Sequence, residues 1–226
     1  MSQSTSQQGF SLVELLIAMA ISSVVMAGVY NMFYTQQRSY TTQEQVAEMQ
    51  QNLRAAMQLM SREIRSAGFD PGQTGRFSRL VTDFPSPNNI FSPDIDYATQ
   101  HKVIAFTMDN SEDGILQANN NEMIAYRLNN RTLERYYVQQ ATWLPLADNI
   151  DALDFVYLDQ NGTPTSVIAD IRAVEISLLV RTNKDDSKYK DTASTYYNKQ
   201  GQSICSACGN DKYRRRLLTT TVYFRN

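Results

Sequence analysis

The sequence predicts an α+β protein in which one long amino-terminal helix is followed by an antiparallel β-sheet. Residues 12–67 contain no proline, so a single helix can run through all of them. From residue 102 onward, short runs of strand-forming residues recur with turn-forming residues between them. A helical segment and a set of strands that are separated along the chain are typical of the α+β class.

Segment 12–34 has the length and polarity of a membrane span. Glu14 is the one charged side chain before Arg38. Counted from Phe10, a helix through residue 34 is about 37 Å long, and the hydrocarbon core of a bilayer is about 30 Å thick. The far end of the segment carries aromatic side chains that favour the membrane interface, namely Tyr30, Phe33 and Tyr34.

A cleaved secretory signal peptide is the first alternative for this segment. The small-residue spacing at Val25 and Ala27 suits signal peptidase, which would leave Gly28 as the first residue. Three features disfavour it: the chain start lacks Lys and Arg, the apolar run is too long, and Glu14 lies inside it.

Glu14 needs an explanation, because a charged group at the centre of a membrane helix costs about 2.5 to 3.5 kcal/mol. One explanation is a capping box with Ser11, in which the helix dipole also favours the carboxylate. The other is a pair with a cation from another chain, since segment 12–34 carries no positive charge. Both explanations stay open.

The residues Gly9-Phe10-Ser11-Leu12-Val13-Glu14 resemble the processing motif of type IV prepilins and type II secretion pseudopilins. The resemblance implies that a prepilin peptidase cuts between Gly9 and Phe10 and methylates the new amine of Phe10. Glycine suits a cut site because its missing Cβ permits close approach of the enzyme. It further implies that Glu14 neutralises the amine of the next subunit during assembly, because an α-amino group of pKa about 7.7 to 8.0 is largely cationic.

Segment 35–67 lacks both proline and glycine, and its residues favour a helix. Its apolar residues are spaced by three or four positions and therefore form one stripe, consisting of Val46, Met49, Leu53, Met57, Met60 and Ile64. We expect this stripe to pack on a globular domain, with a coiled-coil partner as the alternative. Gly68 and Pro71 then end the helix.

Segment 68–101 is rich in proline and polar residues and predicts a loop. Asp94, Asp96 and His101 lie in it, and we expect solvated or structural roles for them. Strands are expected over 102–108, 122–128, 132–139, 153–158, 171–182 and 216–225. Turns are expected at 129–131, which suits a hairpin, and at Asn161-Gly162.

Two local motifs suggest chemistry, and each also has a simpler explanation. Residues 109–114 begin like a calcium loop but lack the glutamate at its twelfth position, which is Asn120, so an exposed turn is expected. Cys205 and Cys208 form a CxxC for which a structural disulfide is favoured over a redox site or a metal site.

A basic cluster, Arg214-Arg215-Arg216, precedes the last strand. These arginines could contact phosphate. The chain has 21 Lys and Arg against 23 Asp and Glu, so its net charge is −2 and it has no overall positive field that would attract nucleic acid. A solvated strand entrance or a salt bridge to a neighbouring subunit is expected instead. No motif of an enzyme active site and no cofactor fingerprint appears, so we expect no catalysis, no cofactor and no metal.

Most of the chain resembles the PilW-like minor pilins. The resemblance rests on the processing motif, the uninterrupted helix to Ser66-Ala67-Gly68-Phe69-Asp70, the stretch at 173–182 and the ending RRRLLTTTVYFRN. The resemblance implies a pilin-like fold: a leader over 1–9, a membrane and assembly helix over 10–34, an amphipathic helix over 35–67, a loop over 68–101 and a periplasmic β-rich domain over 102–226. It also implies an inner-membrane protein that later enters the pilus, with other minor pilins, the major pilin, the prepilin peptidase, the inner-membrane assembly platform and membrane lipid as partners. A J-type pseudopilin of a type II secretion system and a membrane-anchored periplasmic binding module are the alternatives.

Overall fold

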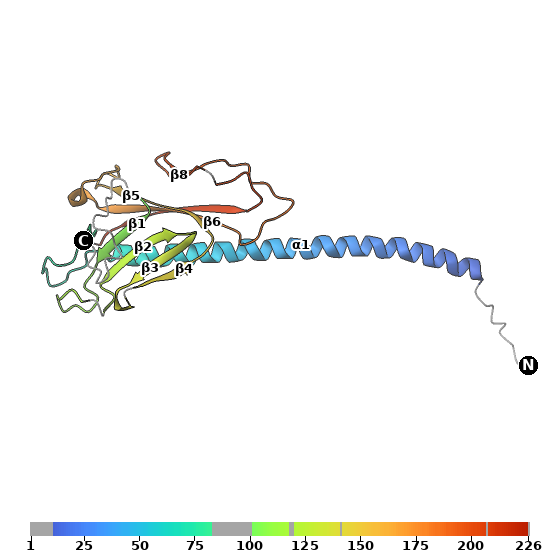
Figure 1. The fold of residues 1–226 in the computed structure, drawn as a ribbon, viewed down its shortest axis with the longest axis horizontal. Coiled ribbons are helices and arrows are strands. Elements are labelled where there is room, and N and C mark those ends of the chain that lie inside the picture. The colour runs from blue at the N-terminus through green and yellow to red at the C-terminus, as the bar shows by residue number, and fades with distance from the viewer. Residues whose placement is uncertain (1–10, 83–100, 118–119, 141, 207, 226) are drawn as a thin grey trace, which may run out of the picture. The chain divides into compact units, whose positions relative to one another are not determined.

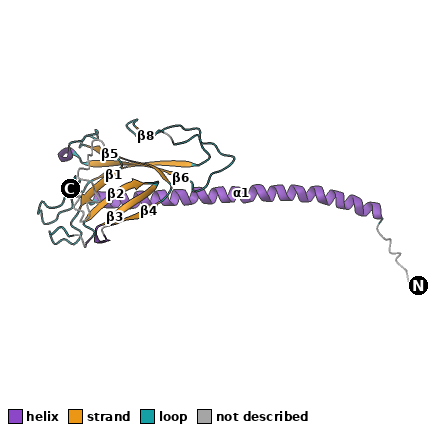
Figure 2. Cartoon of the chain, viewed as in Figure 1, coloured by secondary structure: helices purple, strands orange, loops and turns teal. Residues whose placement is uncertain are grey.

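The computed structural model describes residues 11–82, 101–117, 120–140, 142–206 and 208–225. The chain divides into two compact units, residues 1–44 and residues 45–226. Asp94 and Asp96 lie outside the described residues. Figure 2 shows one long helix and a set of strands, so the predicted α+β class is confirmed.

Helix α1 runs from Leu12 to Arg65 without a break. Ser11 caps its start: the Ser11 Oγ accepts a hydrogen bond from the Val13 N–H at 3.3 Å. At the other end the N–H groups of Ser66 and Ala67 bond three residues back, which tightens the last turn. Gly68 follows with φ of 75°, a left-handed conformation that ends the helix as predicted.

The strands form three antiparallel sheets within the second unit (Figure 1). The first has the order β1-β2-β3-β4, with bounds Val103–Thr107, Met123–Asn129, Thr132–Tyr137 and Thr142–Ala147. The second has the order β5-β6-β9, with bounds Ile150–Leu158, Ala173–Arg181 and Arg215–Tyr223. The third pairs β7 (Tyr196–Tyr197) with β8 (Ser203–Cys205). Two short 3₁₀ helices are η2 (Val138–Gln140) and η3 (Ile168–Asp170).

Six strands lie where the sequence predicts them, whereas β4 and the two short strands β7 and β8 were not predicted. The hairpin between β2 and β3 turns at Asn130 and Arg131, which both have positive φ, as in a type I′ turn. Gly162 likewise has a positive φ in the turn after β5. Strand β4 was not predicted because it contains Pro145; it lies at the sheet edge, where a proline is tolerated.

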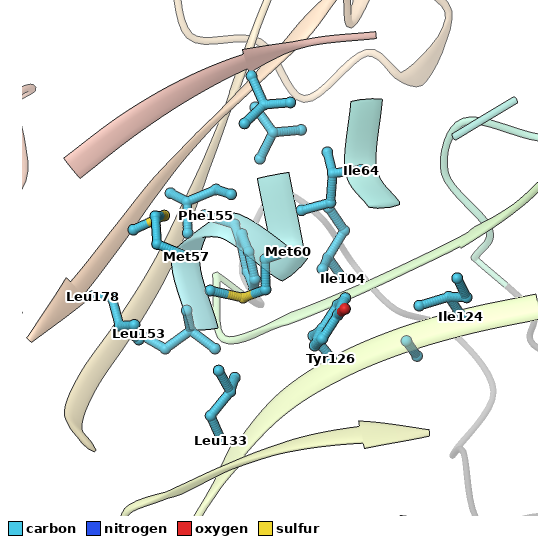
Figure 3. Packing of buried hydrophobic residues seen from close by; sticks show 14 of the residues in the cluster. Met57, Met60, Ile64, Ile104, Ile124, Tyr126, Leu133, Leu153, Phe155 and Leu178 are labelled. Atoms are coloured by element: carbon cyan, nitrogen blue, oxygen red, sulfur yellow. The ribbon is translucent and has the colours of Figure 1, made fainter. Parts of the chain in front are cut away.

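The core forms where the apolar stripe of α1 meets the strands. Figure 3 shows Met57, Met60 and Ile64 of the helix packed among side chains from the first two sheets, among them Ile104, Tyr126, Leu133, Leu153, Phe155 and Leu178. Five of the six predicted stripe residues are buried, and Val46 is half-buried against them. The predicted packing of the stripe on a globular domain is therefore confirmed.

A buried polar contact accompanies this core. Glu63 of α1 accepts hydrogen bonds from the Arg135 Nε at 3.0 Å and the Arg135 Nη2 at 3.2 Å, and a third from the Tyr126 hydroxyl. Burial, together with the charge of Glu63, raises the pKa of Tyr126 well above its usual value, so the phenol keeps its proton and donates a hydrogen bond to the carboxylate. The helix is thus tied to β2 and β3 by charge as well as by packing.

Segment 182–214 packs on the second sheet, and two parts of this segment meet in a close backbone contact. Gly209 has φ of 117°, and a Cβ at this position would overlap the carbonyl oxygen of Ala193. Gly201, with φ of 77°, has nothing within 4 Å of a built Cβ. The two glycines thus separate the effect of backbone strain from the effect of a steric clash.

We expect Gly209→Ala to lower the free energy of unfolding by about 2 to 4 kcal/mol, because strain and overlap act together. Gly201→Ala adds strain alone and should cost about 1 kcal/mol. Denaturant unfolding of both variants measures the difference. Equal losses in the two variants would contradict the close contact between Gly209 and Ala193.

Candidate processing and assembly site

The predicted cut site, Gly9 and Phe10, lies outside the described residues, which begin at Ser11. Glu14 lies in the first turn of α1, where the helix dipole favours a carboxylate, and it is exposed. The Ser11 Oγ bonds the Val13 N–H and the Ser11 carbonyl bonds the Leu15 N–H at 3.1 Å. The Ser11 half of the predicted cap is therefore present. Among the described residues, no Lys or Arg pairs with Glu14, which leaves its carboxylate available to a cation from another molecule.

The helix surface around and beyond Glu14 is apolar and uncovered within its own unit. Fifteen large apolar side chains between Leu12 and Tyr34 have exposed fractions of 56% to 74%. Among the described residues, α1 alone is long and apolar enough to cross a membrane. Its polar side chains bond back to the helix: the hydroxyls of Ser23 and Thr35 donate to the carbonyls of Ala20 and Asn31. A surface of this kind requires lipid or protein around it.

Comparison with known proteins identifies this segment and the domain that follows. Residues 4–30 match the prokaryotic N-terminal methylation motif, and residues 42–198 match prepilin peptidase-dependent protein B. The second match covers more than half of the chain. The chain belongs to the prepilin peptidase-dependent protein B family. It is therefore a type IV pilin-like protein with a prepilin methylation motif, and the predicted resemblance is confirmed.

One solved structure similar to this family member is a type IV-like pilin from Thermus thermophilus. The two share 13% sequence identity, and the alignment covers 78% of this chain and 96% of the other, with a TM-score of 0.46. A search of curated proteins finds no match to the sequence.

The two cysteines of this family member lie in segment 182–214, far along the chain from the methylation motif. Cys205 and Cys208 form a disulfide with their Cα atoms 5.6 Å apart. Cys208 is buried and packs with Ala152 and Leu179 of the second sheet. The disulfide thus shapes a loop that covers the sheet.

The basic cluster, residues 214–216, was expected to be solvated at the start of the last strand or to pair with a neighbouring subunit. The structure shows instead that two of its arginines pair within the chain. The side chain of Arg215 is buried and pairs with Asp151 at 2.7 Å, Asp191 at 2.9 Å and Asp211 at 2.6 Å. The hydrogen bonds that its guanidinium donates to these carboxylates, that to Asp211 first, raise the pKa of Arg215. These pairs lie within the chain because Asp151 belongs to β5 of the same sheet, whereas Asp191 and Asp211 lie in segment 182–214, where the Asp191 N–H bonds the Asp211 carbonyl.

The two neighbours of Arg215 differ in their contacts: Arg214 has partners within the chain, whereas Arg216 is exposed to solvent. Arg214 pairs with Asp186 at 2.9 Å and stacks over Tyr189, with its guanidinium carbon 4.3 Å from the ring centroid. Arg216 is exposed. Two of the three arginines are therefore engaged within the chain, so a phosphate site made by all three finds no support.

His101 and Asp109, two further positions with predicted surroundings, both contact other parts of the chain. The Nδ1 of His101 lies 3.0 Å from the carbonyl oxygen of Phe155, and the backbones of these residues also bond. Asp109, expected in an exposed turn, is instead fully buried, although residues 110–113 are exposed. The expectation for Asp109 was wrong because Asp109 lies two residues after the buried end of β1, next to the buried Met108.

Proposed function

We propose that this family member is a minor pilin of a type IV pilus that acts in an initiating complex at the pilus tip. The observation that carries the proposal is an unpaired acid, Glu14, at the start of an uncovered apolar helix that follows a methylation motif. Each part of this arrangement has a use in filament assembly and none in a catalytic site. The role is structural.

Processing is the first step of the proposal. Prepilin peptidase removes residues 1–9 after Gly9 and methylates Phe10. Segment 10–34 then holds the protein in the inner membrane, with the β-rich domain, residues 102–226, in the periplasm. The apolar side chains of this segment contact lipid before assembly and other pilin helices afterwards, because both surroundings satisfy an apolar surface.

Assembly uses the two opposite charges at the start of the helix. The amine of Phe10 on one subunit is largely cationic at neutral pH. Glu14 on the neighbouring subunit neutralises it, and in a low-dielectric setting this attraction is far stronger than in water. The expected neighbours are other minor pilins and the major pilin, brought together at the inner-membrane assembly platform.

Replacing Glu14 by alanine tests the pairing step. We expect Glu14→Ala to be cut after Gly9 as the natural chain is, but to enter filaments at least tenfold less, because the amine of the neighbouring subunit stays unpaired. Glu44→Ala is the matched control, since Glu44 is an exposed acid of the same helix beyond the apolar segment. Immunoblots of sheared pili against membranes give the ratio. Unchanged piliation in Glu14→Ala would contradict the pairing role.

A further inference from the structure

Three carboxylates converge in the loop between β1 and β2. Asp109, Asp113 and Glu122 each place a carboxylate oxygen within 4.8 Å of the others. Asp109 and Glu122 are fully buried, whereas Asp113 is exposed at the mouth of the group. Negative charges brought this close repel one another, and burial weakens the screening by water. Such a group is stable when a cation lies among them.

One buried oxygen in the group has no hydrogen-bond partner among the described residues. The Asp109 Oδ2 accepts a hydrogen bond from the Gly114 N–H at 3.0 Å. The Asp109 Oδ1 is buried, and no described residue donates a hydrogen bond to it. Buried polar atoms are nearly always bonded, so a cation suits this carboxylate oxygen, which lies beside two other carboxylates. No Lys or Arg in the described parts of the chain pairs with any of the three acids.

Hydrogen bonds from residues of the same loop hold the carboxylates of Glu122 and Asp113 in place. The Glu122 Oε1 accepts hydrogen bonds from the Ser111 Oγ at 2.7 Å and the Ser111 N–H at 3.3 Å, and its Oε2 accepts one from the Gln117 N–H at 2.7 Å. The Asp113 Oδ1 accepts one from the Ile115 N–H at 2.8 Å, and its Oδ2 one from the Gln117 Nε2 at 2.5 Å. The group is therefore oriented before any ion arrives.

We propose that Asp109, Asp113 and Glu122 bind one Ca²⁺ ion. The spacing of oxygen side chains at Asp109, Ser111 and Asp113, followed by Gly114 with φ of 71°, is that of the first half of a calcium loop. In such a loop a glutamate at the twelfth position completes the site. Here Glu122, two residues beyond Asn120, takes that place because the chain returns into β2.

The loop spacing and the ligand chemistry favour Ca²⁺ over other divalent ions. Ca²⁺ takes six to eight oxygen ligands at about 2.3 to 2.6 Å in flexible geometry, which carboxylates within 4.8 Å of one another can provide, whereas Mg²⁺ requires near-octahedral order and keeps several of its waters. The set holds oxygen and no nitrogen or sulfur, so it does not suit zinc or copper. Three carboxylates leave the bound site with one net negative charge.

Calcium titration of the full chain in detergent, after treatment with a chelator, tests the proposal. We expect one Ca²⁺ per chain by calorimetry, with a Kd of about 10⁻⁴ M and at least tenfold weaker binding of Mg²⁺. At a hundredfold excess of Ca²⁺ over the Kd, the Tm should rise by about 5 to 10 °C. Absence of Ca²⁺ binding to the natural chain would overturn the proposal, and so would equal binding of Mg²⁺.

Substitution of single acids in the loop tests whether the ion binds at this group. Asp109→Asn and Asp113→Asn should each weaken Ca²⁺ binding at least tenfold and remove the rise in Tm, because each loses one charged ligand. The exposed Asp113 keeps the test informative if the buried Asp109→Asn does not fold. Glu112→Gln is the matched control, since Glu112 is an exposed acid of the same loop outside the group, and it should bind as the natural chain does. Full affinity in Asp113→Asn, or loss in Glu112→Gln alone, would place the ion elsewhere and overturn the assignment.

Discussion

Glu63→Ala should lower the free energy of unfolding by about 3 to 5 kcal/mol, because it leaves the buried Arg135 without its counter-charge. Arg135 is 5% exposed, and Glu63 provides both of its carboxylate contacts. The change also leaves the Tyr126 hydroxyl, which is buried, without its acceptor. Domains of this size have only about 5 to 15 kcal/mol of stability, so a large share would be lost.

The measurement is chemical denaturation of the full chain in detergent, followed by the fluorescence of Trp143, the one tryptophan of the chain. Trp143 lies on β4 and packs against Tyr136, with the ring centroids 5.2 Å apart, so it reports on the first sheet. Glu48→Ala is the matched control, since Glu48 is an exposed acid of the same helix, and it should change stability by less than about 0.5 kcal/mol. Similar losses in the two variants would show that the buried contact adds little.

Gly9→Leu should abolish cleavage and leave the full-length chain in the inner membrane. The physical reason is that the peptidase must approach the backbone at the cut, where glycine has no Cβ and a branched side chain obstructs it. We expect the processed form to fall at least a hundredfold, to the limit of detection. Its absence from pili should follow, because the amine of Phe10 never becomes free to pair with Glu14.

The control for this variant is Gly28→Leu, the same change inside the apolar segment. A Cβ built at Gly28 has nothing within 4 Å, so leucine fits there as further lipid-facing surface. This variant should be processed as the natural chain is. Immunoblots that separate the two forms by size measure both variants, and a processed form of Gly9→Leu would show that the cut lies elsewhere.

The sequence predicts the helix and most strands because their signals are local. The stripe of α1 follows from residues three or four apart, and the hairpin at Asn130 follows from turn chemistry within three residues. The methylation motif is likewise contiguous, which is why the family could be recognised without a structure.

Contacts between distant residues could not be predicted in this way. The pairing of Glu63 with Arg135 joins positions 72 apart, and that of Arg215 with Asp151 joins positions 64 apart. The group of Asp109 and Glu122 was missed for a related reason: the test for a calcium loop assumes a fixed spacing, and here the return of the chain into β2 provides the acid. Spacing along the chain reveals a site only when one element provides all of it.

We expect the mature protein to begin at Phe10 and to use the amine made there to pair with Glu14 of a neighbouring subunit. Mass spectrometry of the amino-terminal peptide from native membranes and pili identifies this first residue. It should be an N-methylated Phe10. A native protein that begins at Met1, as a plain membrane anchor would, or at Gly28, as a chain cut by signal peptidase would, contradicts it.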